Sequence, residues 1–203
     1  MSKKSSKWYK AHINDEFVKL ANKENWRSRA VFKLKEIDEK YNLVKANSKI
    51  IDLGSAPGGW SQYAARKHKN IEIIAVDLLH MESLENVNFV QSDIADFGKN
   101  YVKKGGFSKI DLVMSDIAPN ISGIGSADVP AMLNLADIVI EFALTALNDS
   151  GNLLLKLFQG KGTDEYLKQT RSYFNKVRII KPKASKSNSR EIYMLATSLK
   201  INQ

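Results

Sequence analysis

The strongest constraint on the fold is an apolar run, Ile50 to Leu53, that passes directly into a glycine-rich turn and a helix start. Glycines at positions 54, 58 and 59 would let the backbone approach a ligand without a Cβ clash, and the helix start would offer unpaired N–H groups. A strand, turn and helix in this order can hold a nucleotide-like cofactor. The glycines lack the G-x-G-x-x-G spacing that holds a pyrophosphate, which argues against a dehydrogenase.

Acidic residues follow the next two predicted strands. Asp77 ends the apolar run 71–76, and Asp93 follows the run 87–91. Because the carboxyl ends of parallel strands meet at one edge of a sheet, both carboxylates are expected beside the glycine turn. Asp77 could accept hydrogen bonds from a ribose diol, and Asp93 could read an adenine amino group. The sequence therefore favours a cofactor with an adenosine end.

Five sequence blocks then narrow the choice among adenosine cofactors. In chain order they are RSRAVFKL (27–34), DLGSAPGGWSQY (52–63), MSDIAPN (114–120), KLFQG (156–160) and SREIY (189–193). Together they resemble the FtsJ/RrmJ family of ribosomal RNA 2′-O-methyltransferases, and they span most of the chain in the family's order. The block 114–120 also differs from the Asp/Asn-Pro-Pro-aromatic segment of amino-methylating enzymes, because it lacks an aromatic ring that could stack on an extruded base.

The resemblance implies a fold and a cofactor. The fold would be α/β, a class I S-adenosylmethionine-dependent methyltransferase (Rossmann-like) with a seven-stranded, mostly parallel sheet and helices on both faces. The cofactor would be S-adenosyl-L-methionine. Trp60 could instead be an ordinary core residue. The residues that match cofactor-binding positions are Gly54, Ser55, Pro57, Gly58, Gly59, Trp60, Asp77, Leu78, Asp93, Ile94 and Asp116.

Catalysis would depend on a buried lysine beside a carboxylate. Lys156 is flanked by apolar residues, and a buried lysine is costly unless it is paired or neutral. A neutral amine could accept the proton that a ribose hydroxyl loses as it attacks the methyl group. The resemblance assigns this role to Lys156 within a constellation of Lys33, Asp116, Lys156 and Glu191. The alternative is a structural ion pair between Lys156 and Asp116.

Secondary-structure patterns agree with alternating strands and helices in one domain, 1–203, with a basic helical appendage at about 1–47. Asn14 or Asp15 could cap a first helix and Ser28 a second, and Pro130 could open a long helix that ends near Leu147. Residues 162–174 form another predicted helix. Strands are expected at 48–53, 71–76, 87–91, 109–115, 151–158, 176–181 and 190–198.

Charge is unevenly distributed along the chain. The segments 1–47 and 156–190 have net charges of +6 and +8, whereas 48–155 has −5. Two basic flanks could frame a track for a polyanion, although solvated surface lysines would give the same composition. The candidate RNA contacts are Lys3, Lys4, Lys7, Lys10, Arg27, Arg29, Lys181, Lys183, Lys186 and Arg190, with Trp8 and Tyr9 as aromatic neighbours.

Composition excludes several other classes. The chain has no cysteine, which rules out disulfides and the thiolate needed for methylation at C5 of a pyrimidine. Its three histidines lack metal-ligand spacing, so no metal site is expected. The start of the chain lacks a secretory apolar segment, and no membrane span is expected. We expect a cytoplasmic monomer.

The predicted function is 2′-O-methylation of a ribose, with a uridine of large-subunit ribosomal RNA as the expected target. Two alternatives remain open at this point. The same chemistry could act on transfer RNA or another RNA, or the chain could be a non-catalytic ribosome-assembly factor that keeps the fold.

Overall fold

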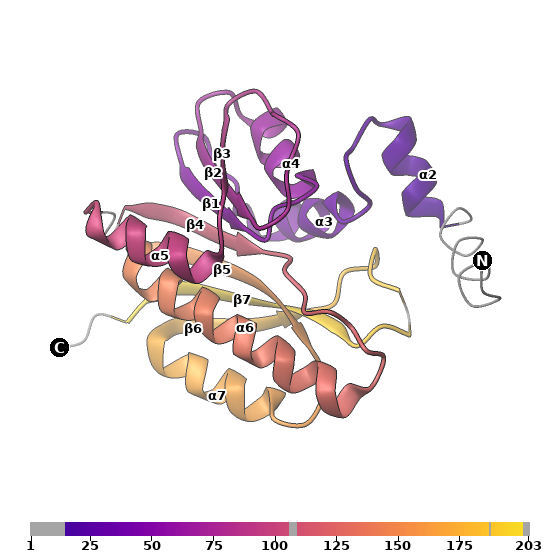
Figure 1. Ribbon diagram of the computed structural model, residues 1–203, viewed down its shortest axis with the longest axis vertical. Helices are drawn as coiled ribbons and strands as arrows, with labels where there is room; N and C mark the ends of the chain where they lie inside the picture. The colour runs from indigo at the N-terminus through magenta and orange to yellow at the C-terminus, as the bar shows by residue number, and fades with distance from the viewer. Residues whose placement is uncertain (1–14, 106–108, 187, 201–203) are drawn as a thin grey trace.

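A seven-stranded sheet in the order β3-β2-β1-β4-β5-β7-β6 forms the centre of the computed structural model, which describes residues 15–105, 109–186 and 188–200 (Figure 1). The seven predicted strands are confirmed, and six of them begin and end within two residues of the prediction. The strands are β1 (Lys49–Leu53), β2 (Glu72–Asp77), β3 (Val87–Gln91), β4 (Ile110–Ser115), β5 (Leu147–Phe158), β6 (Phe174–Ile180) and β7 (Glu191–Leu199).

The pairing directions place the carboxyl ends of five parallel strands at one edge. β3, β2, β1, β4 and β5 are parallel, whereas β7 lies antiparallel between β5 and β6. The start of β7 therefore meets the end of β5, and Glu191 pairs with Phe158. β5 begins four residues earlier than predicted, because the chain leaves the preceding helix directly into a strand whose register shifts between Ile110 and Leu112.

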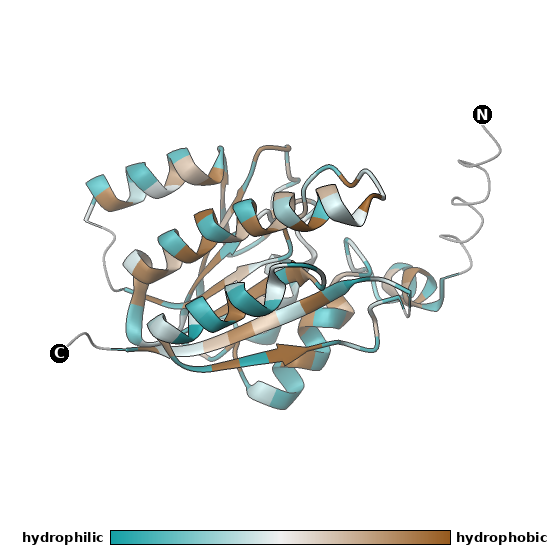
Figure 2. Ribbon diagram, turned by 90° about the horizontal axis from the view of Figure 1, so that it is seen from below, coloured by the Kyte–Doolittle hydropathy of each residue, from teal (hydrophilic) through white to brown (hydrophobic). Residues whose placement is uncertain are grey.

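Helices cover both faces of the sheet, as predicted. One face carries α5 (Ile94–Lys103), α6 (Gly125–Ala146) and α7 (Thr163–Tyr173), and the other carries α3 (Val31–Tyr41) and α4 (Gly59–Lys67) (Figure 1). α2 (Glu16–Lys23) lies beyond α3 and adds Ala21 to the core. Figure 2 shows brown apolar stripes along α6 and α7 alternating with teal polar ones, the pattern of amphipathic helices.

The alternation of β5 decides which side chains reach the chemistry. Leu153, Leu155 and Leu157 belong to the apolar cluster under α5, α6 and α7, whereas Leu154 belongs to the cluster under α3 and α4. Because side chains alternate along a strand, Lys156 points to the α3/α4 face with Leu154. Its ion pair with Asp116 places that carboxylate on the same side.

Two predicted helix starts are wrong. α6 begins at Gly125 rather than at Pro130, which lies exposed inside the helix, because Asp128 in the first turn holds the preceding chain in a tight turn. Ser28 does not cap α3, whose N-cap is Ala30 without a side-chain bond. The cap at Asp15 is present, since its carboxylate accepts a bond from Phe17 N–H at 3.0 Å.

Within the described ranges, α6 is the one helix long and apolar enough to cross a membrane by length and composition. Its apolar residues Ala136, Val139 and Ala143 are fully buried in the core cluster against the sheet. Core helices of globular domains satisfy the same two criteria, so α6 is accounted for by its packing.

Candidate active site

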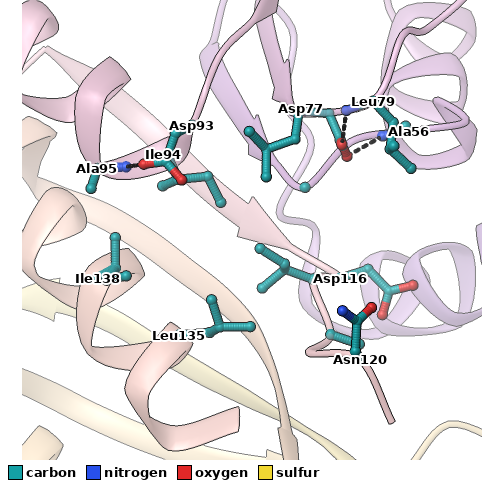
Figure 3. Close-up of a pocket in the computed structure, with 14 residues that line it drawn as sticks. Ala56, Asp77, Leu79, Asp93, Ile94, Ala95, Asp116, Asn120, Leu135 and Ile138 are labelled. Carbon is teal, nitrogen blue, oxygen red and sulfur yellow. Dashed lines mark hydrogen bonds between the residues drawn. The ribbon is translucent and has the colours of Figure 1, made fainter. Parts of the chain in front are cut away.

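Two adjoining cavities open at the carboxyl edge of the sheet, where the sequence predicts the cofactor. The larger has a volume of about 420 Å³. Figure 3 shows Asp77 on one side of it, Asp93 with Ile94 on another, and Asp116 with Asn120 below. The predicted cofactor residues that line it are Gly54, Asp77, Leu78, Asp93, Ile94 and Asp116.

The smaller cavity, of about 140 Å³, shares Gly54, Ala56 and Asp116 with the larger one. Trp60 closes one side with 3% of its surface exposed, and its indole N–H donates to the Ala30 carbonyl at 2.9 Å. Trp60 is therefore both a core residue and a wall of the site. The predicted cofactor residues that line this cavity are Gly54, Ser55, Pro57, Gly59, Trp60 and Asp116.

Gly58 lines neither cavity, and its contact with the cofactor stays a prediction. Its φ of +100° is the left-handed conformation that favours glycine. A Cβ there would lie 2.7 Å from Met81 Sδ and 3.0 Å from an Arg27 nitrogen. Gly58 is therefore needed for packing between the turn and its protein neighbours. Gly54, with φ +74°, approaches Ile117 in the same manner.

The two predicted carboxylates are held by backbone N–H groups. Asp77 accepts bonds from Ala56 at 2.9 Å and from Leu79 at 2.8 Å, one on each oxygen (Figure 3). Asp93 is the N-cap of α5, and one of its oxygens accepts bonds from Ala95 N–H at 2.8 Å and from Asp96 N–H at 3.3 Å, which leaves the other oxygen available. A carboxylate oxygen can accept two bonds, so both groups keep acceptor capacity toward the cavity.

Ser55 and Asp52 indicate that the smaller cavity is built for a polar ligand. The Ser55 hydroxyl is buried, and no described residue gives it a hydrogen-bond partner. Burial, together with the charges of Asp116 and Asp77, raises the pKa of Asp52 to about 7, although a 2.7 Å bond from the Ser61 hydroxyl opposes the shift. An orphaned hydroxyl and a destabilised carboxylate both fit the polar, cationic amino-acid end of S-adenosylmethionine.

All four predicted catalytic residues meet in one network beside the cavities. Lys156 Nζ donates to the Asp116 carbonyl and lies 3.2 Å from Asp116 Oδ1. Lys33 Nζ lies 2.7 Å from Glu191 Oε1, which also accepts a bond from the Ser185 hydroxyl at 2.9 Å. Lys156 and Lys33 are 6% and 9% exposed, so both ammonium-bearing side chains are buried and paired.

Tyr193 joins the two ion pairs, and the sequence prediction missed it. Its hydroxyl donates to Asp116 Oδ1 at 2.6 Å, and Glu191 Oε1 lies 3.3 Å away. Burial and the charges of Asp116 and Glu191 raise the pKa of Tyr193 far above its ordinary value, so the hydroxyl remains a donor. The signal was present, because Tyr193 follows Glu191 by two positions and strand alternation puts both on one face.

Two predicted RNA contacts are occupied within the protein. Arg27 donates to the carbonyls of Pro57, Glu82 and Ser83, and Arg29 pairs with Asp15 and binds the Ala184 carbonyl. These arginines brace the fold around the site. Lys181 binds the Ser189 carbonyl, and Lys183, Lys186 and Arg190 are exposed. Lys3, Lys4, Lys7, Lys10, Trp8 and Tyr9 lie outside the described residues.

No group of three or more potential His, Cys, Asp or Glu metal ligands occurs in the part of the chain that the structure describes. His80 is exposed and its ring contacts Phe89 at 6.3 Å between centroids.

Solved structures with the same fold are methyltransferases. A protein of Plasmodium falciparum described as a ribosomal RNA methyltransferase is 30% identical, with a TM-score of 0.77 over 86% of this chain and 98% of that chain. Human methyltransferase-like protein 13, solved with SAH, is 12% identical, with a TM-score of 0.62 over 83% and 79%. The second likeness concerns the fold alone. The predicted class I methyltransferase fold is confirmed.

Curated relatives match over nearly the whole chain. Ribosomal RNA large subunit methyltransferase E of Psychrobacter sp. (strain PRwf-1) is 44% identical over 97% of this chain and 95% of its own length. The protein of the same name from Legionella pneumophila (strain Corby) is 44% identical over 96% of both. The model of the FtsJ-like methyltransferases matches residues 26–199, and the chain therefore belongs to the FtsJ-like methyltransferase family.

Proposed function

We propose that this protein transfers a methyl group from S-adenosylmethionine to the 2′-hydroxyl of a ribose in large-subunit ribosomal RNA, with a uridine as the target. The observation that carries the proposal is the buried network in which Tyr193 joins the Lys156–Asp116 pair to the Lys33–Glu191 pair beside the cavities. Burying charged groups costs desolvation energy, and apolar residues would stabilise the fold at a lower cost. Buried charges of this kind cluster at functional sites, which favours a catalytic role over a purely structural one.

S-adenosylmethionine is the cofactor of this methyltransferase, and when bound it supplies a methyl group activated by a positively charged sulfur. Asp77 and Asp93 would hold its adenosine end in the larger cavity, and Ser55, Asp52 and Trp60 would surround its amino-acid end in the smaller one. Asp116 lines both cavities, so it lies where the two ends of the cofactor meet.

Lys156 is the proposed general base. A neutral amine has two N–H groups and one lone pair. The Asp116 carbonyl accepts one N–H group of Lys156, and Asp116 Oδ1 lies 3.2 Å from the same nitrogen. The remaining lone pair can accept the proton of the ribose hydroxyl as the oxygen attacks. The Asp116 carboxylate then stabilises the new ammonium group, as an ion pair with a charged hydrogen bond.

The other network members position these groups. Tyr193 holds Asp116 through Oδ1, and Lys33 balances the charge of Glu191. Because alignment of the attacking oxygen with the methyl group supplies much of the barrier reduction in such displacements, rigid placement of Asp116 and Lys156 is itself catalytic.

The choice of ribosomal RNA rests on the relatives, whose names specify the large ribosomal subunit and which match nearly end to end. The exposed cations Lys183, Lys186 and Arg190 near the start of β7 suit a polyanionic substrate. The proposal keeps the expectation of a cytoplasmic monomer in one domain, 1–203, with its basic segment at 1–47.

The test is to incubate the protein and labelled S-adenosylmethionine separately with ribosomal subunits, total ribosomal RNA and transfer RNA. Ribose methylation removes the hydroxyl that drives alkaline strand scission, so alkali-resistant linkages identify the modified nucleotide. We expect label in large-subunit RNA at a uridine ribose. Label on a base would contradict the reaction type, and label only in transfer RNA would contradict the substrate.

A further inference from the structure

Two large apolar side chains stand exposed on the loop between β4 and α6. Ile121 is 64% exposed and Ile124 is 60% exposed. The residue before Ile121, Asn120, lines the larger cavity together with Asp116 (Figure 3). Single exposed apolar side chains are common, but two of them on one short loop beside a reaction centre form a surface that a ligand in the site could contact.

The loop is fixed by Asp128 of α6. The Asp128 carboxylate accepts bonds from Ser122 N–H at 2.8 Å, from the Ser122 hydroxyl at 2.7 Å and from Gly123 N–H at 3.0 Å. These bonds, aided by the nearby charge of Arg190, lower the pKa of Asp128 and keep it ionised. Ile121 and Ile124 flank the bonded pair, so both are displayed on a backbone that is already ordered.

Arg190 lies against the same loop from the other side. Its guanidinium rests over Gly125, the first residue of α6, in the place that a Cβ on that residue would take. Its positive charge also acts on the nearby Asp128 carboxylate. The carbonyl of Arg190 accepts a bond from Gln159 N–H at 2.8 Å, which fixes its backbone, and the next residue is Glu191 of the catalytic network.

The loop, Arg190 and the network together span the edge of the sheet. Lys156 and Tyr193 lie on the α3/α4 face, whereas α6 and its first turn cover the opposite face. A ligand that reaches Lys156 and also contacts Ile121 and Arg190 must therefore cross the carboxyl edge.

We propose that Ile121, Ile124 and Arg190 form a subsite for the unpaired nucleotide next to the target ribose, with the base between the two isoleucines and its phosphate on the guanidinium. This inference rests on RNA being the substrate, as proposed above. Apolar side chains commonly clamp unstacked bases, and arginine binds phosphate with paired N–H groups. The exposed cations Lys161, Lys183 and Lys186 favour RNA over a protein partner at this surface.

The test measures binding of a fluorescent single-stranded oligoribonucleotide, with the mapped target sequence, by anisotropy at fixed salt. The full-length variants are the double substitution Ile121→Ser with Ile124→Ser, and separately Arg190→Gln. We expect each to raise the RNA Kd about tenfold, the size of one lost base or phosphate contact. Calorimetry should give an unchanged Kd for S-adenosylmethionine.

Gly125→Ala is a third variant that moves Arg190 without removing its charge. An alanine side chain would occupy the place of the guanidinium, and alanine is favourable at a helix start without positive φ. We expect a loss of RNA affinity about as large as that of Arg190→Gln. The matched controls are Ile179→Ser, an exposed isoleucine on the edge strand β6, and Lys168→Gln on α7, neither of which should change the Kd by as much as twofold.

An abasic nucleotide on either side of the target identifies the occupant. Wild-type protein should lose affinity for one of the two abasic oligonucleotides, whereas the isoleucine double variant should bind both abasic forms and the intact RNA equally. An unchanged Kd in the isoleucine variant, or a full abasic penalty in it, would overturn the subsite. Retained RNA binding with loss of a ribosomal protein contact would assign the surface to a protein instead.

Binding and turnover separate the two proposals. If wild-type protein binds the oligonucleotide through these residues but methylates no ribose, the proposed function fails and the subsite stands. If wild-type protein methylates the ribose and the variants keep both Kd and KM, the subsite fails and the function stands.

Discussion

The two faces of the sheet differ in what they bury. The face under α5, α6 and α7 is formed by a large apolar cluster that includes Val113, Leu155 and Ala143, all fully buried. Among the residues that the structure describes, four of the five buried charged side chains lie on the α3/α4 face, and the fifth, Asp128, lies at the start of α6. The four are Lys33, Asp38, Asp52 and Lys156.

This difference separates stability from chemistry. An apolar face lowers the free energy of folding in proportion to the area it buries, whereas buried charges oppose folding unless each is paired. Asp38 shows the pairing at its most complete, with bonds from Leu43, Val44, Tyr63 and Lys67. The α3/α4 face therefore holds the buried charges of the site, which oppose folding, and the apolar face supplies the stability that offsets them.

We expect the largest effect from substitutions of two neighbouring β5 residues whose side chains point to opposite faces of the sheet. Lys156→Ala should lower turnover by about 10² to 10⁴, the contribution of a general base, and leave the Kd for S-adenosylmethionine nearly unchanged. Initial rates on the RNA substrate and calorimetry of cofactor binding measure the two quantities. An equal loss of turnover and cofactor binding would contradict the role of Lys156 as base.

Leu155→Ala is the matched control for the opposite face. Its side chain is fully buried, so truncation should lower the free energy of unfolding by about 2 to 5 kcal/mol while the folded fraction keeps its kcat. Urea unfolding and active-site titration distinguish the outcomes. A large kcat defect in folded Leu155→Ala would mean that the two faces are not separable.

The second effect concerns Asp52. Its pKa is raised to about 7 from 3.8, so the folded state keeps a proton that the unfolded chain releases, and stability falls as pH rises from about 4 to 7. In Asp52→Asn this contribution disappears. The variant should gain stability relative to wild type over that range, by on the order of 4 kcal/mol at most.

Urea unfolding of both proteins at pH 5 and pH 7.5 measures the difference, with changes at other groups cancelling between them. Parallel stability profiles would show that Asp52 is already ionised in the folded protein. If the stability advantage of Asp52→Asn over wild type were larger at pH 5 than at pH 7.5, its sign would be wrong for a raised carboxyl pKa.

We expect the smallest effect from a substitution that tests how the buried charges of the α3/α4 face are connected. Tyr193→Phe removes the hydroxyl that joins the two ion pairs while keeping the ring against Trp60, 5.8 Å between centroids. We expect kcat to fall about tenfold, as for loss of a charge-assisted hydrogen bond, with little change in KM. A structural role alone would lower the unfolding free energy and leave kcat of the folded enzyme intact.

Strand-end position made part of the site predictable, because Asp116 and Lys156 stand at the ends of neighbouring strands that meet at one edge. Lys33 and Glu191 were predicted from the family resemblance, and their ion pair lies beside the first one. The seven strands followed from apolar runs between turns. The two-residue alternation of a strand is visible in its local sequence, and it is kept when the strand joins the sheet.

The remainder depended on long-range packing. Nothing near Arg27 in the sequence shows that its guanidinium binds carbonyls about 30 and 55 residues away, so it resembled a free RNA contact. The turn motif likewise does not reveal that Met81 approaches Gly58 so closely that a Cβ there would lie 2.7 Å from its sulfur. The helix α5 had no separate prediction, although Asp93 caps it, because that carboxylate was assigned wholly to the cofactor.

Arg27 also sets a limit on how far the protein can be shortened. Its guanidinium donates hydrogen bonds to the carbonyls of Pro57, Glu82 and Ser83, and so links residue 57 to the segment 82–83. Its backbone N–H donates to Gln62 Oε1 at 2.9 Å. Removing residue 27 would release Pro57, which lines the smaller cavity, from the segment 82–83. The smallest fragment that still captures the methyl donor therefore starts no later than Arg27, and removal of that residue should weaken capture before the strands unfold.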